Sequence, residues 1–135
     1  MTQPWTIEQA RQTYAIANWG EGYFDVGDAG DLRVCPRGPD GIEVSLPAVV
    51  EAACAQGARL PLLVRFADIL RHRLGRLQGA FAKAMTDCDY AGGYTAVYPI
   101  KVNQNRHVVE EILDVDHRAT PRSRESPTRQ SSEYP

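Results

Sequence analysis

The sequence predicts an α/β fold, mainly because strand-like and helix-like segments alternate in its second half. Between Asp68 and Met85, apolar residues recur at three- and four-residue steps, which is the period of an amphipathic helix. The segments Leu62–Phe66 and Tyr94–Val102 are apolar and rich in β-branched or aromatic residues, as expected of strands. A further helical pattern covers Arg106–Leu113. The order strand, long helix, strand, helix is that of the opening of an α/β barrel, here an incomplete one.

The first sixty residues predict short elements joined by turns. Thr6 is a candidate N-cap with Gln9 three residues on, a capping-box arrangement that starts a helix running to about Ile16. Three elements follow: strands and tight turns over Trp19–Ala29, a strand over Leu32–Pro36, and a helix from Leu46, capped by Ser45, that ends near Gly57.

The long helix over Asp68–Met85 is the clearest element of the chain. Gly75 and Gly79 each weaken it by roughly 1 kcal/mol relative to alanine, and they would permit a close helix–strand approach. Its basic residues fall largely opposite the apolar stripe, where we expect a solvated face rather than an anion or RNA surface. These basic residues are Arg71, Arg73, Arg76 and Lys83.

Composition excludes several classes of protein. The chain has 43% hydrophobic and 24% charged residues and a net charge of -2, which argues against general nucleic-acid binding. We expect no membrane association, because no apolar run is long enough to span a bilayer, and the N-terminus shows no signal-peptide pattern. Three cysteines without a Cys-x-x-Cys pair predict a reduced, cytoplasmic protein. The three histidines lack metal-ligand spacing, so no metal site is expected from the protein's own side chains.

Lys101 is the residue with the most specific chemistry. The chain has only two lysines, Lys83 and Lys101, against thirteen arginines. Lysine, unlike arginine, can lose its proton when desolvated and then form a Schiff base with a carbonyl, as in pyridoxal phosphate enzymes. The residues alone leave two interpretations open: a reactive amine at the end of a buried strand, or an ordinary lysine that extends from a strand end into solvent.

Several blocks of the sequence together resemble one enzyme family. The segment Tyr98–Gln104 (YPIKVNQ) is similar to the cofactor-lysine segment of biosynthetic arginine decarboxylases, which are pyridoxal phosphate enzymes with an alanine racemase-like fold. The resemblance covers roughly residues 5 to 113, in the family's order. The other matching blocks are Tyr14–Val26 (YAIANWGEGYFDV), Leu60–Leu70 (LPLLVRFADIL, with Ala67 where proline is usual), His72–Phe81 (HRLGRLQGAF) and Arg106–Ile112 (RHVVEEI).

The resemblance implies a function and a division of the chain. It implies decarboxylation of L-arginine to agmatine and carbon dioxide, in polyamine and spermidine biosynthesis, with pyridoxal phosphate held as a Schiff base on Lys101. It also implies a homo-oligomer in the intact family and magnesium as a further candidate cofactor. Residues 1–66 would contribute to a β domain, and residues 67–113 would open the cofactor-binding (β/α)8 barrel. Asn103 and Gln104 are expected to have a structural role, and His107 to be a surface residue.

The remaining residues resemble nothing in that family. Residues 114–135 are rich in Arg, Ser, Pro, Thr and Glu, so we expect a disordered tail, from a frameshift or as a regulatory extension. The resemblance then implies a truncated chain that is inactive alone. Two alternatives stay open: another basic amino acid decarboxylase of the same fold group, such as an ornithine or diaminopimelate decarboxylase, and a non-catalytic fragment or interaction module.

Overall fold

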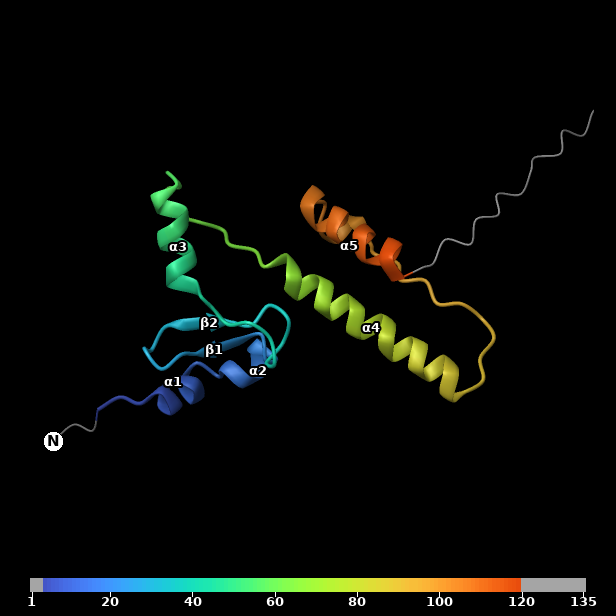
Figure 1. The fold of residues 1–135 in the computed structure, drawn as a ribbon, viewed down its shortest axis with the longest axis horizontal. Helices are drawn as coiled ribbons and strands as arrows, with labels where there is room; N and C mark the ends of the chain where they lie inside the picture. The colour runs from blue at the N-terminus through green and yellow to red at the C-terminus, as the bar shows by residue number, and fades with distance from the viewer. Residues whose placement is uncertain (1–3, 120–135) are drawn as a thin grey trace, which may run out of the picture.

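The chain forms a small α/β structure with a three-stranded antiparallel sheet near its N-terminus and two packed helices toward its C-terminus (Figure 1). A computed structural model describes residues 4–119. The sheet has the order β1-β2-β3. The helices and strands are α1 (Ile7–Thr13), α2 (Ile16–Gly20), β1 (Phe24–Val26), β2 (Leu32–Val34), β3 (Val44–Ser45), α3 (Leu46–Ala55), α4 (Ala67–Asp87), the 3-10 turn η1 (Ile100–Val102) and α5 (Arg106–Ala119).

The N-terminal elements confirm most of the local predictions. Thr6 and Gln9 form the expected capping box at the start of α1. Strand β2 lies within the predicted segment, and Phe24 of β1 pairs with Val34 of β2. Ser45 occupies the N-cap of α3, but its hydroxyl donates to Asp31 at 2.7 Å instead of capping the helix.

The buried core lies entirely in this N-terminal part of the described chain. Val34 is fully buried, Tyr23 is 2% exposed, and Ala10, Ile16 and Val26 form a cluster between α1, α2 and β1. In α3 and α4, by contrast, no residue is fully buried. The sheet and its two short helices therefore form the only closed core within residues 4–119.

Helix α4 is attached to this core by polar and aromatic contacts. The Tyr23 hydroxyl lies 2.8 Å from Nδ1 of His72, and the two rings meet edge to face. Gly38 is buried with a φ of +89°, and a Cβ there would come within 3.2 Å of the His72 ring. A side chain at position 38 would strain the backbone and displace the imidazole, so glycine permits this close approach.

Two predictions about α4 need correction. Gly75 and Gly79 face open space and mediate no close helix–strand contact. The basic face is also not simply solvated. Arg71 pairs with Asp68 at 2.8 Å and with Glu111 of α5 at 2.6 Å, and Arg73 pairs with Glu21 at 2.9 Å and lies over the Tyr23 ring. These arginines join α4 to its neighbours because carboxylates and an aromatic face lie opposite them.

Both predicted strands of the second half are absent. Residues 62–66 and 94–99 run without assigned secondary structure, and Lys101 lies in the 3-10 turn η1 instead of at a strand end. The reason is that a strand requires a hydrogen-bonded neighbour. Within residues 4–119, the only sheet is β1-β2-β3, and neither segment joins it. The barrel prediction therefore stays a prediction.

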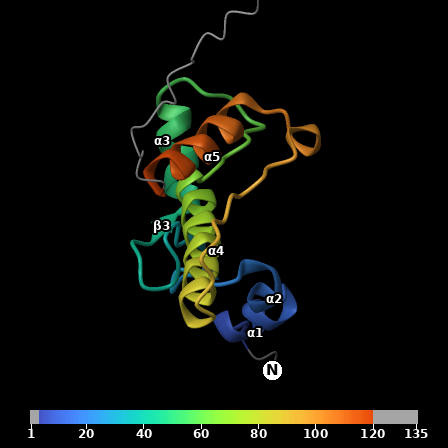
Figure 2. The same cartoon turned by 90° about the vertical axis from the view of Figure 1, so that its right-hand side faces the viewer.

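Helix α5 is longer than expected. It starts at Arg106 as predicted but continues to Ala119, whereas the disordered tail was expected from residue 114. The helix packs against α4, beside the N-terminal half of that helix (Figures 1 and 2). The rest of the predicted tail, residues 120–135, lies outside the described residues.

The Arg11–Asp25 ion pair predicts an acid-sensitive N-terminal part. Arg11 donates to both Asp25 carboxylate oxygens at 2.7 and 2.8 Å, and these bonds hold the pKa of Asp25 below its ordinary value of 3.8. A lowered folded-state pKa contributes stability above the unfolded-state value that is lost as the pH falls through the folded-state value. We expect the melting temperature to fall as the pH drops below about 4.

The substitution Asp25→Asn should make that fall shallower, because it removes one of the carboxylates that titrate. Thermal melting followed by circular dichroism at a series of acidic pH values measures the slope. Asp40→Asn is the matched control, since Asp40 is exposed and its carboxylate makes no hydrogen bond or ion pair within residues 4–119. Equal slopes in the wild type and Asp25→Asn would contradict the assignment.

Candidate functional site

Lys101 occupies an exposed turn between α4 and α5. It is the central residue of η1, which is closed by hydrogen bonds from Val102 N to Pro99 O at 3.0 Å and from Asn103 N to Ile100 O at 3.2 Å. Within residues 4–119, no hydrogen bond or ion pair engages its ammonium group. The amine is therefore accessible, but it is not desolvated.

Hydrogen bonds of Tyr98 and Asn103, which flank this turn in sequence, stabilise it. The Tyr98 hydroxyl donates to the Asn103 carbonyl at 3.2 Å, and the Asn103 side chain accepts from the Asn105 backbone at 3.0 Å. The second contact leads the chain into α5. These contacts are of the kind expected for a structural role of Asn103, and that role stays a prediction. The part played by Tyr98 was not predicted, since a tyrosine five residues from its backbone acceptor leaves no recognisable sequence signal.

The second lysine has a different environment. The Lys83 ammonium on α4 is paired with Asp87 one turn further on, and both side chains are largely exposed. This is an ordinary helix-surface ion pair. Lys101 is thus the one lysine of the chain without an acidic partner among the described residues.

His107 fits the surface role expected of it. Its side chain is exposed near the start of α5, with Nδ1 3.8 Å from Glu110. Glu110 in turn accepts from Arg106 at 2.6 Å, which raises the pKa of that guanidinium. These contacts stabilise the first turns of α5 and contribute nothing directed at Lys101.

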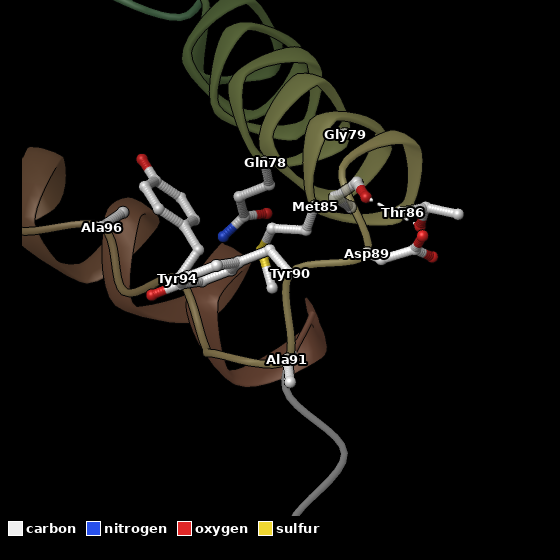
Figure 3. A pocket seen from close by; sticks show the side chains of 10 residues that line it. Gln78, Gly79, Met85, Thr86, Asp89, Tyr90, Ala91, Tyr94 and Ala96 are labelled. Carbon is white, nitrogen blue, oxygen red and sulfur yellow. Dashed lines mark hydrogen bonds between the residues drawn. The ribbon is translucent and has the colours of Figure 1, made fainter.

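Several hollows border the segment that leads to Lys101, and two of them are lined by Ala96 or by residues closer to the lysine in sequence. One, of about 740 Å³, lies between the C-terminal half of α4 and residues 89–96, with Gln78 and Met85 facing Tyr90 and Tyr94 (Figure 3). The other, of about 140 Å³, lies in the α4–α5 seam and is lined by Leu74, Tyr98 and Ile112 among others. Neither hollow is lined by a lysine, arginine or histidine.

The fit to pyridoxal phosphate is therefore partial. Lys101 supplies an amine that could carry the cofactor, as the resemblance implies. A phosphate also needs cationic side chains or a glycine-rich helix start, and these two hollows, neither of which is lined by Lys101, offer neither within the described residues. No group of three His, Cys, Asp or Glu side chains placed to hold a metal ion occurs in that part of the chain either.

The known proteins that the chain resembles belong to one class of enzyme. Over about three quarters of its length, the chain is homologous to amino acid decarboxylases. These relatives are, more particularly, biosynthetic arginine decarboxylases. Those of Xylella fastidiosa and Xanthomonas campestris are 62% and 66% identical over 104 residues, or 77% of this chain, and that of Gloeobacter violaceus is 46% identical over 112 residues, or 83%.

The resemblance to arginine decarboxylases is thus confirmed, with a clear limit on its extent. The chain spans about 17% of the length of the curated relatives it matches. No protein-family model matches the chain. Among residues 4–119, no helix is both long enough and apolar enough to cross a membrane.

Proposed function

We propose that this chain corresponds to the opening part of a pyridoxal phosphate-dependent arginine decarboxylase and that Lys101 carries the cofactor. The observation that supports this most strongly is the 62–66% identity over 104 residues to proteins named as biosynthetic arginine decarboxylases. The proposed reaction converts L-arginine to agmatine and carbon dioxide, in polyamine biosynthesis. A cytoplasmic homo-oligomer, with magnesium as a further cofactor, belongs to the same proposal.

The role of Lys101 in this proposal follows from its chemistry and its place in the chain. Its primary amine would hold the cofactor covalently and release it to the incoming substrate amine. When bound, pyridoxal phosphate supplies an electron sink for the electrons left behind as carbon dioxide departs. Tyr98 and Asn103 fix the turn that carries the amine. The groups for the phosphate and for arginine would come from the parts of the relatives that this chain does not span.

The barrel belongs to the proposal as well. In a complete barrel, residues 94–101 would pair with neighbouring strands on both sides, and Lys101 would then lie at the C-terminal end of the first strand. The alternating exposure of residues 94–98 supports this, because it is the period of a strand. The non-catalytic alternative is favoured by a different observation, namely that Lys101 lines neither hollow and that neither hollow contains a cationic side chain.

A chimera tests the proposed activity. The matching 104-residue segment of the Xylella relative is replaced by the corresponding segment of this chain, and release of labelled carbon dioxide from L-arginine is measured. We expect activity on arginine that depends on added pyridoxal phosphate, because the substituted segment would supply the lysine and the relative would supply the remaining pocket.

Two controls accompany the chimera. L-ornithine, offered as the competing substrate, should release little carbon dioxide. The 135-residue chain alone should release none from either amino acid. Without a pocket, the pKa of the lysine is not lowered and the cofactor is not held in the orientation that the reaction needs. A folded chimera without activity, or one that prefers ornithine, would contradict the proposal.

A further inference from the structure

An ion pair between Arg71 and Glu111 joins α4 to α5 and is shielded from solvent. Nε of Arg71 lies 2.6 Å from Oε2 of Glu111, and both of these atoms are buried. The pair formed by the preceding glutamate, Glu110 with Arg106, has the same separation of 2.6 Å, but its side chains are exposed and belong to a single helix. Breaking the Arg71–Glu111 pair would therefore leave an uncompensated charge at the contact between two helices.

A second carboxylate fixes the orientation of the Arg71 guanidinium. Asp68, one turn earlier on α4, accepts from Nη1 of Arg71 at 2.8 Å and from Nε of Arg37 at 3.1 Å. These bonds, the one from Arg71 above all, hold the pKa of Asp68 below its ordinary value of 3.8, so the carboxylate is charged at neutral pH. Asp68 and Glu111 thus engage different nitrogens of one planar, rigid group, which fixes where α5 lies relative to α4.

The seam beside this ion pair receives a residue of the turn η1. Ile100 lines the hollow of about 140 Å³ between α4 and α5. Leu74, one turn after Arg71, lines the hollow from α4. Ile112, directly after Glu111, lines it from α5. Because packed side chains transmit small shifts to their neighbours, a change in the spacing of the two helices at the ion pair also changes the surroundings of Ile100.

We propose that Arg71 and Glu111 are positioning residues for Lys101. Their ion pair sets the spacing of α4 and α5, this spacing seats Ile100 in the seam, and Ile100 is bonded directly to Lys101. Neither residue of the pair needs to touch the substrate or the cofactor. The consequence for catalysis rests on the proposed function, whereas the effect on the position of Lys101 does not.

Selective labelling of lysine tests the positional effect directly. The 135-residue chain has only two lysines, so labelling with nitrogen-15 lysine gives two backbone amide signals in a nuclear magnetic resonance spectrum, from Lys83 and from Lys101. We expect Glu111→Gln to shift or broaden the Lys101 signal and to leave the Lys83 signal unchanged, because Lys83 lies in the C-terminal half of α4, away from Arg71. Glu110→Gln is the matched control: it makes the same change one residue away and should move neither signal.

The variant Arg71→Gln, alone and combined with Glu111→Gln, shows whether the two residues act as a unit. The double variant should move the Lys101 signal no further than Arg71→Gln does, because both remove the same contact. Three results would overturn the proposal: equal movement of the Lys83 and Lys101 signals, which would indicate a general effect on stability; an unmoved Lys101 signal; or a Lys101 signal that Glu110→Gln moves as far as Glu111→Gln does.

The chimera measures the catalytic consequence. There, Glu111→Gln should lower the turnover number for arginine by about tenfold with KM nearly unchanged, because a small displacement of a reacting group costs alignment. Glu110→Gln should leave both constants unchanged. Full turnover in the Glu111→Gln chimera would contradict the catalytic role of the pair. An unaltered chimera without activity would contradict the proposed function instead, and the two lysine signals would still decide whether the pair positions Lys101.

Discussion

Replacing Lys101 by alanine in the chimera is expected to lower the turnover number for arginine on the order of a thousandfold or more, because the covalent attachment point of the cofactor is removed. A Lys101→Arg variant should be equally inactive. Its guanidinium keeps the positive charge but is always protonated and cannot act as the nucleophile. The difference between a lost charge and a lost nucleophile is thus tested within one pair of variants.

The chain contains its own control for this experiment. Lys83→Ala removes the only other lysine of the chain, which lies on α4 in an exposed ion pair with Asp87. Its loss should leave turnover and cofactor absorbance unchanged, since an exposed pair of this kind contributes at most about 1 kcal/mol of stability. Substantial activity in Lys101→Ala, or its loss in Lys83→Ala, would assign the cofactor to another position.

Tyr23→Ala is expected to have the largest effect on stability, about 3–5 kcal/mol. The side chain is 2% exposed, its hydroxyl bonds to His72, and its ring contacts both His72 and the Arg73 guanidinium. Truncation leaves a large cavity in a small core and also removes the anchor of α4. Denaturation in urea, followed by far-ultraviolet circular dichroism, measures the loss, and a variant that is largely unfolded without urea meets the expectation.

Tyr23→Phe separates the ring from the hydroxyl. It keeps the packing and loses only the bond to His72, so the expected cost is about 1 kcal/mol. His72→Phe should cost a similar amount if the hydroxyl bond is the main polar contact between core and helix. Equal stability of Tyr23→Ala and Tyr23→Phe would mean that the ring contributes no packing, against the burial described here.

Local sequence signals predicted α1, α3, α4 and the start of α5, but they missed α2 (Ile16–Gly20), because the single helix expected to run to about Ile16 ends at Thr13. The capping box at Thr6, the N-cap position of Ser45 and the apolar period of α4 are each set by residues within a few positions of one another. The start of α5 at Arg106 follows the same rule. The C-terminal end of α5 was predicted wrongly, because the polar composition after Leu113 suggested disorder, whereas the helix continues to Ala119.

The two strand predictions show what local pattern cannot supply. Residues 62–66 and 94–102 have the composition of strands, but a strand is completed by a hydrogen-bonded neighbour, and no strand within residues 4–119 pairs with either segment. The predicted position of the candidate site was wrong for a similar reason. The sequence identified Lys101 as the reactive candidate, whereas its position in an exposed turn depends on packing around Tyr98 and the α4–α5 seam. Likewise, no sequence pattern joins Tyr23 to His72, which lie 49 positions apart.

The confinement of the closed core to the first part of the chain has a consequence for biosynthesis on the ribosome. Every fully buried apolar residue among those described lies between Ala10 and Cys35, so this core is complete in sequence well before the Lys101 segment is made. Domains fold as they emerge during translation. The first part can therefore form its sheet early. Among the contacts of Tyr23, the one from His72 then forms later, once α4 has been made. Residues 94–98 are made after this core, and they pack on α4 through the stacking of Tyr94 on Phe81.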